Sequence, residues 1–210
     1  MSFQFNSADL VIVSGLPRSG TSVMMQMLAA GGVPVLSDGV RVPDVDNPQG
    51  YFEFEPVKKT RQDPRWLQQA QGKAVKVVHL LLLELPLSLH YHVILMRRAM
   101  EEVLASQRTM LQRLGKSGAG LPDNRLASIY TEQMEMTRRW LFSQPQFRTL
   151  EVNYIDCVRN PVMTAAAVNS FLGGRLDEEK MVGTVMPSLY RNRSVRASSS
   201  GHDANCGPAF

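Results

Sequence analysis

A loop between an expected strand and an expected helix constrains this chain most strongly. Residues 10–14 (LVIVS) form a short run rich in β-branched residues, and residues 21–30 (TSVMMQMLAA) are rich in helix-forming residues. Between them lies the segment Gly15–Gly20 (GLPRSG), whose glycines and proline are typical of a turn. Main-chain N–H groups in such a loop and at the start of the following helix form a concave site that attracts anions. The sequence therefore predicts an anion-binding site in this loop.

The rest of the chain alternates in the same way between expected strands and expected helices. Short apolar runs predict strands at residues 74–78, 92–96 and 148–152, and longer stretches predict helices at residues 100–114, 124–142 and 161–172. Such alternation is typical of an α/β three-layer sandwich with a mostly parallel central sheet. In these sheets the ligand site lies at the carboxyl ends of the strands, which is where the glycine loop would stand.

We expect one folded domain over residues 1–193 and a disordered tail over residues 194–210. The chain of 210 residues is long enough for one domain with a sizeable core. From Ser194 the sequence (SVRASSSGHDANCGPAF) turns to Ser, Ala, Gly and Asn, a composition that does not build a packed core.

Charge and composition indicate which kinds of ligand and partner to expect. Lys and Arg number 23 against 19 Asp and Glu, and the resulting net charge of +4 suits a small anionic ligand. No run of five Lys or Arg occurs, so no nucleic-acid partner is expected. The longest apolar stretch, residues 77–89, is broken by polar residues and a proline and is too short for a membrane span. With two cysteines, Cys157 and Cys206, and no secretory signal pattern, we expect a cytoplasmic protein, and the oligomeric state stays open.

The loop differs from the phosphate-binding loop of ATP and GTP enzymes at one important position. That loop has the pattern GxxxxGK[ST], whereas here Thr21 takes the place of Lys and Arg18 lies inside the loop. In those enzymes the Lys contacts the β- and γ-phosphates, and the next hydroxyl holds Mg²⁺. We therefore expect a donor with fewer phosphates and no bound metal. The alternative is a tight turn that binds no ligand.

The same loop resembles the 5′-phosphosulfate loop of sulfotransferases, commonly G-x-P-[RK]-S-G-T-[ST]. The matching residues are Gly15, Pro17, Arg18, Ser19, Gly20, Thr21 and Ser22. The resemblance extends over residues 10–193 and implies a P-loop NTPase-like fold. It also implies transfer of a sulfuryl group from 3′-phosphoadenosine 5′-phosphosulfate (PAPS) to a hydroxyl or amine of a small acceptor, which the sequence does not identify. Arg18 and the loop amides would then stabilise the leaving phosphate during an in-line transfer.

The 3′-phosphate of PAPS needs partners of its own. In sulfotransferases a strand ends in Arg and a Ser follows eight residues later, and Arg98 and Ser106 have this spacing. A guanidinium can make charge-assisted bonds to phosphate, and a serine two turns along the helix can lie on the same face. The alternative is a solvated ladder of ion pairs between Arg97–Arg98 and Glu101–Glu102.

Two segments offer the general base that a hydroxyl acceptor needs in order to lose its proton. Asn47–Glu53 (NPQGYFE) resembles an N-P-x-G-[YF]-[FYW]-E motif of bacterial sulfotransferase-family proteins, which makes Glu53 a catalytic candidate and Glu55 its neighbour. His79 is the second candidate, because its spacing to a downstream proline is similar to that of the catalytic His in cytosolic sulfotransferases. Lys76 stands three residues before His79, where that family has its Lys two before, which weakens the match. A solvated Glu and a core His are the alternatives.

Three further segments resemble parts of a sulfotransferase. Glu151–Asp156 (EVNYID) looks like the strand end at which a sulfotransferase Tyr contacts adenine, so Tyr154 is the expected adenine contact. Arg191 and Arg193 would correspond to the basic loop that closes over the 3′-phosphate in larger sulfotransferases. The segment 107–144 would cover the acceptor pocket.

The sequence thus favours a PAPS-dependent sulfotransferase and leaves two alternatives. One is a divergent P-loop kinase or NTPase, which the missing Lys of the loop disfavours. The other is a non-catalytic protein that binds PAPS or its desulfated product, adenosine 3′,5′-bisphosphate (PAP), because the identity of the base is open.

Overall fold

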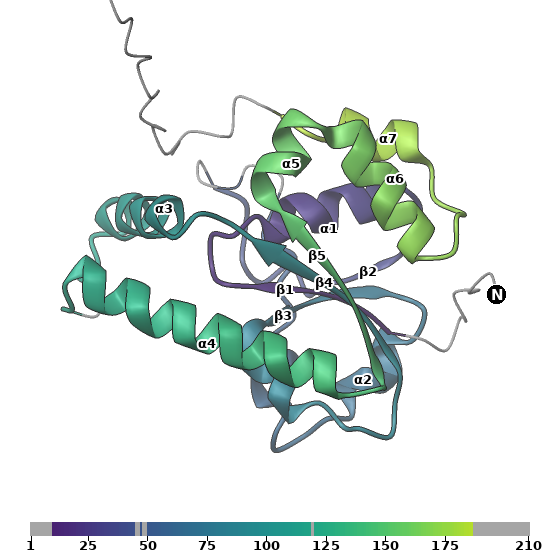
Figure 1. Cartoon of the computed structure of the whole chain (residues 1–210), viewed down its shortest axis with the longest axis horizontal. Coiled ribbons are helices and arrows are strands. Elements are labelled where there is room, and N and C mark those ends of the chain that lie inside the picture. The colour runs from purple at the N-terminus through teal and green to yellow at the C-terminus, as the bar shows by residue number, and fades with distance from the viewer. Residues whose placement is uncertain (1–9, 45–46, 48–49, 119, 187–210) are drawn as a thin grey trace, which may run out of the picture.

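A five-stranded sheet forms the centre of the fold (Figure 1). The computed structural model describes residues 10–44, 47, 50–118 and 120–186. The strands lie in the order β2–β3–β1–β4–β5, and every neighbouring pair is parallel. Their bounds are β1 (Leu10–Gly15), β2 (Val35–Leu36), β3 (Ala74–Val78), β4 (Tyr91–Arg97) and β5 (Phe147–Asn153). The predicted α/β sandwich with a parallel central sheet is confirmed.

Helices cover both faces of the sheet. Helices α1, α6 and α7 pack on one face, and α2 and α4 lie on the other, while α3 projects beyond the sheet edge (Figure 1). The α-helices are α1 (Thr21–Ala30), α2 (Trp66–Ala70), α3 (Met100–Arg113), α4 (Asp123–Ser143), α5 (Tyr154–Arg159), α6 (Pro161–Phe171) and α7 (Glu178–Gly183), and two 3-10 helices are η1 (Glu55–Lys59) and η2 (His79–Glu84).

Strand β1 is buried along its whole length because it lies between two strands and beneath two layers of helices. Its side chains alternate between the faces of the sheet. Leu10 and Ile12 pack into the cluster under α2 and α4, whereas Val11 and Val13 pack into the cluster under α1 and α6. A strand covered on both faces has to be apolar throughout, which explains the unbroken run at residues 10–13.

The carboxyl ends of the central strands lie side by side and define one edge of the sheet. Gly15 of β1 is in register with Val78 of β3 and with Met96 of β4. The glycine loop, the residues after β3 and the residues after β4 therefore all start from this edge. Strand β5 ends at Asn153, in register with Arg97, so α5 starts there as well.

Some elements were not predicted from the sequence. Strand β2 has two residues inside a segment expected to be a loop, and α5 and α7 have six residues each, too few to show a helical period. The predicted tail, together with Arg191 and Arg193, lies outside the described residues. Over the ranges that are described, no helix combines the length and hydropathy needed to cross a bilayer.

Candidate functional site

A cavity of about 380 Å³ opens at the carboxyl edge of the sheet. Many of the residues singled out from the sequence line it: Gly15, Pro17, Arg18, Gly20, Thr21, Ser22, Glu53, Lys76, Arg98, Ser106 and Tyr154. Thr109, Met110 and Arg113, from the segment expected at the acceptor pocket, also line it, together with Arg41 and Tyr51, which the sequence did not single out. The cavity thus joins the glycine loop, the segment before η1, the end of β3, one face of α3 and the start of α5.

The loop after β1 adopts a conformation in which its main chain can face an anion. Gly20, just before α1, has a φ of 99°, in the left-handed region that favours glycine. Arg18 has a φ of 72°, which a residue with a side chain seldom adopts. The first N–H groups of α1 have no acceptor within the helix, and no acidic side chain stands in its first turn. The loop and the helix start therefore keep donors and a positive dipole end for an anion.

Arg18 connects this loop to α3. Its Nε donates a hydrogen bond to Oγ of Ser106 at 2.9 Å, across 88 residues of sequence. The Ser106 side chain is buried and lines the cavity. The loop and the Arg98–Ser106 pair, which the sequence predicts as two anion sites, therefore belong to a single cavity and lie close enough for one ligand to reach both.

Arg98 is buried at the base of the cavity. Its Nη1 donates to the carbonyl oxygen of Arg18 at 3.0 Å, and its Nε donates to Glu102 at 2.9 Å. This ion pair was part of the alternative prediction, a solvated ladder of ion pairs. The pair is not solvated, however, because the Arg98 and Glu102 side chains are only 8% and 5% exposed. Arg97 belongs to a different group of contacts, because its guanidinium pairs with Glu151 at 3.2 Å. Of the two arginines, Arg98 alone lines the cavity.

Tyr154 packs against both the glycine loop and Arg98. The Arg98 guanidinium carbon lies 4.4 Å from the centre of the Tyr154 ring, which is a cation–π contact. A Cβ added at Gly20 would stand 2.3 Å from Cδ2 of the same ring. Burial raises the pKa of the Tyr154 hydroxyl, so it stays protonated near neutral pH. The ring is thus a fixed wall of the cavity beside the loop.

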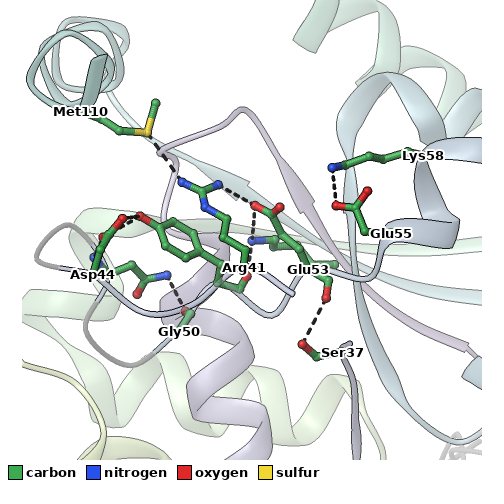
Figure 2. Close-up of polar contacts among 11 residues, drawn as sticks. Ser37, Arg41, Asp44, Gly50, Glu53, Glu55, Lys58 and Met110 are labelled. Atoms are coloured by element: carbon green, nitrogen blue, oxygen red, sulfur yellow. Dashed lines mark hydrogen bonds and ion pairs between the residues drawn. The ribbon is translucent and has the colours of Figure 1, made fainter. Parts of the chain in front are cut away.

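Glu53 also lines the cavity and lies among cations (Figure 2). Its Oε1 accepts a hydrogen bond from Nη1 of Arg41 at 2.8 Å and lies 3.8 Å from Nζ of Lys76. The Glu53 side chain is 25% exposed, so the carboxylate is reachable from the cavity. Glu55, by contrast, pairs with Lys58 on the surface at 2.5 Å. Glu53 is therefore the acid of this segment that the fold brings to the cavity.

Lys76 lies in the middle of β3 and extends from the sheet to Glu53. Its Nζ donates to the carbonyl oxygen of Tyr51. Burial lowers the pKa of Lys76 to about 8, against the opposite effect of the Glu53 charge. A lysine with this pKa is mostly charged at neutral pH and becomes neutral under mildly alkaline conditions.

His79 starts η2 and does not line the cavity. It is 3% exposed, and its Nε2 lies 3.1 Å from Oε1 of Gln133 on α4. Burial lowers the pKa of His79, so the imidazole is neutral at physiological pH. In this position His79 joins α4 to the end of β3.

Arg41 and Tyr51 are the site residues that sequence reasoning missed. Arg41 comes from a Pro-, Gly- and Asp-rich segment that shows no helical or strand pattern. Tyr51 lies within the Asn47–Glu53 motif, so its place in that motif was the available signal. The contact between Arg41 and Tyr51 forms only in the folded chain, so no local sequence pattern predicts it.

A comparison with models of known protein families identifies the family of this chain. The model of the sulfotransferase domain family matches residues 8–200. The chain therefore belongs to the sulfotransferase domain family, as the resemblance of its loop predicted. No curated protein matches the sequence.

Three solved structures are similar to this chain at low identity. Retinol dehydratase, in complex with androsterone and inactive cofactor PAP, has 17% identity and a TM-score of 0.48, over 88% of this chain and 64% of that chain. The sulfotransferase domain of the Synechococcus PCC 7002 olefin synthase has 15% identity and a TM-score of 0.48, over 93% and 90% of the two chains. Mouse sulfotransferase SULT7A1, complexed with PAP, has 14% identity and a TM-score of 0.45, over 90% and 66%. This chain spans less than two thirds of the length of retinol dehydratase and of the mouse protein.

The contact between Gly20 and Tyr154 gives a test with a matched control. Gly20 and Gly32 have φ values of 99° and 97°, but nothing stands within 4 Å of a Cβ at Gly32. Both alanine variants should lose about 1 kcal/mol of unfolding free energy from the left-handed backbone. Gly20→Ala should lose about 1–3 kcal/mol more, because Tyr154 has to move. Urea unfolding measures both losses, and equal values for the two variants would show that Tyr154 is not packed on the loop.

Proposed function

We propose that this chain transfers a sulfuryl group from PAPS to a hydroxyl of a small acceptor, without a metal. The observation that carries the proposal is the single cavity in which the glycine loop and the Arg98–Ser106 pair meet through the Arg18 side chain. A doubly phosphorylated nucleotide needs two anion sites at short separation, and the residues that we propose for both line this cavity. Membership of the sulfotransferase domain family supports the same chemistry.

The proposed donor site uses the contacts described above. The loop amides, Arg18 and the start of α1 would hold the 5′-phosphosulfate. Arg98 and Ser106 would hold the 3′-phosphate through a charge-assisted hydrogen bond and a hydroxyl. Tyr154 would pack against the adenine, since its ring forms a wall of the same cavity. Arg191 and Arg193, outside the described residues, remain proposed partners of the 3′-phosphate.

In the proposed reaction the acceptor oxygen attacks sulfur from the side opposite the bridging oxygen of the phosphosulfate. The new S–O bond to the acceptor forms while the S–O bond to the phosphate breaks, and PAP leaves with the bonding pair on its phosphate. The acceptor proton passes to the carboxylate of Glu53 as general base. Glu53 suits this role better than His79, because Glu53 lines the cavity and His79 does not.

Lys76 would supply a positive charge beside the transferring group. Its ammonium lies 3.8 Å from the Glu53 carboxylate and lines the same cavity, so it would act on the charge that develops on the sulfuryl oxygens and the leaving phosphate. Arg18 would act on the same charge from the loop.

Two observations disfavour the alternative of a kinase or NTPase. The chain belongs to the sulfotransferase domain family, and its glycine loop lacks the Lys of the GxxxxGK[ST] pattern. A protein that binds the nucleotide without transferring sulfate differs from an enzyme in one measurable way. Incubation with radiolabelled PAPS and a panel of alcohols, phenols and amines should give labelled acceptor, in the presence of a chelator as well as without it. Tight PAP binding with no labelled product across the panel would favour the non-catalytic protein.

Arg98 should determine the preference for a 3′-phosphate. Arg98→Met should weaken the binding of PAP by about tenfold or more beyond its effect on adenosine 5′-phosphate, because both nucleotides need the loop that Arg98 bonds but only PAP has the 3′-phosphate. Calorimetry in the presence of a chelator measures both affinities.

Arg97→Met is the matched control and should change neither affinity. Because Arg98→Met strands the buried carboxylate of Glu102, the double variant Arg98→Met/Glu102→Gln is measured alongside. Equal losses for the two nucleotides would remove Arg98 from the 3′-phosphate site.

Glu53 should be needed for transfer but not for donor binding. Glu53→Gln keeps the shape of the side chain and removes the proton acceptor, so we expect the transfer rate to fall by about 10²–10⁴-fold with unchanged affinity for PAP. Glu55→Gln, on the surface next to it, should leave the rate unchanged. A rate that survives Glu53→Gln would return His79 to consideration, and His79→Asn would then be measured.

The pH dependence of transfer should report Lys76. In the folded protein the pKa of Lys76 is about 8, below that of an ordinary lysine. The ammonium is therefore present at pH 7 and loses its proton as the pH rises through 8. We expect the rate at saturating substrates to fall between pH 7 and pH 9. Lys76→Gln should be slow and should lack this decline. A wild-type rate that stays level over this interval would contradict the proposed role.

A further inference from the structure

Positive charge at the cavity exceeds what the proposed donor uses. Among the described residues, five cationic side chains line the cavity, those of Arg18, Arg41, Lys76, Arg98 and Arg113, and the one carboxylate among them is that of Glu53. The donor would engage Arg18 and Arg98. At the acceptor end Arg41 and Lys76 share the single charge of Glu53, so this group keeps a net positive charge. A positively charged pocket attracts anionic ligands.

Arg41 is held in a fixed orientation on this wall (Figure 2). Its guanidinium carbon lies 3.4 Å from the centre of the Tyr51 ring, so the two planar groups are in direct contact. Tyr51 is itself buried, and its hydroxyl donates to the carboxylate of Asp44, with both carboxylate oxygens at 2.7 Å. A guanidinium positioned before binding loses little freedom when it meets a planar anion.

The donors of Arg41 are only partly used. Nη1 donates to Glu53, but the partner of Nη2 is the thioether sulfur of Met110 at 3.9 Å, which is a weak acceptor. Within the described part of the chain Arg41 makes no other hydrogen bond, although a guanidinium has five N–H donors. The side chain is 37% exposed and faces the cavity. Arg41 can therefore donate hydrogen bonds to a carboxylate or phosphate group while its bond to Glu53 stays in place.

We propose that the acceptor is a small hydroxyl compound with an anionic group, a carboxylate or a phosphate, which Arg41 binds. This inference rests on the proposed function and deepens it. Arg41 donates to Glu53, the proposed general base, and within the described residues it makes no hydrogen bond to the glycine loop, which assigns the guanidinium to the acceptor end and not to the phosphosulfate. An anion at Arg41 would bring the attached hydroxyl next to Glu53, where its proton has to be removed.

The test compares matched ligands on the PAP-bound protein by calorimetry. The pairs are 4-hydroxyphenylacetate with 4-hydroxyphenylacetamide, and glycerol phosphate with glycerol, so that carboxylate and phosphate are tested separately. In at least one pair the anion should bind about tenfold or more tightly than its neutral partner. Arg41→Gln should remove this preference, and Arg41→Lys should restore part of it. Lys58→Gln, which removes a nearby surface cation, should leave the preference intact.

Each outcome decides a separate point. If no anion binds more tightly than its neutral partner, the acceptor proposal is wrong, while the proposed function stands as long as PAP binds. If Arg41→Gln weakens PAP as much as it weakens the anionic probe, Arg41 belongs to the donor site and the acceptor proposal is also wrong. If the wild-type protein fails to bind PAP at all, the proposed function itself fails and this inference fails with it. Urea unfolding of Arg41→Gln shows whether a loss reflects the site or the fold.

Discussion

The buried guanidinium of Arg98 is the interaction on which the rest of the cavity depends. One side chain bonds the main chain of the glycine loop through the carbonyl of Arg18, pairs with Glu102 on α3 and packs on the ring of Tyr154 at α5. Three segments far apart in sequence are thereby held at one sheet edge. A charge buried to this degree is tolerated only when its hydrogen bonds are satisfied, so the position of each partner is fixed with it.

Much of the fold could be predicted because its signals are local. The apolar run of β1, the turn residues of the loop and the helix formers of α1 lie within about 20 residues, and each reports its own conformation. The spacing of Arg98 and Ser106 spans the start of α3, and both side chains line the cavity, whereas their role toward a phosphate stays a prediction. The parallel sheet then followed from the alternation of strands and helices.

The contacts around Glu53 in the cavity wall could not be predicted from the sequence, for a physical reason. Arg41, Tyr51 and Lys76 meet only after β2 and β3 pair and the segment between β2 and η1 folds over the sheet edge. Strand β2 has two residues, so neither its period nor its pairing is visible in the sequence. Likewise, Arg98 could be seen as a phosphate ligand or as a partner of Glu102. The structure shows the pair with Glu102 in a buried position, which spacing alone cannot indicate.

The left-handed main chain at Arg18 sets stability and activity against each other. Gly or Asn would adopt its φ of 72° with less strain than an arginine, of the order of 1 kcal/mol. Yet the guanidinium of Arg18 reaches Ser106, and neither of those residues could make that contact. Directed evolution for heat resistance alone would therefore tend to remove arginine from this loop, and the selected variants would be more stable proteins that lack the bond between the loop and α3.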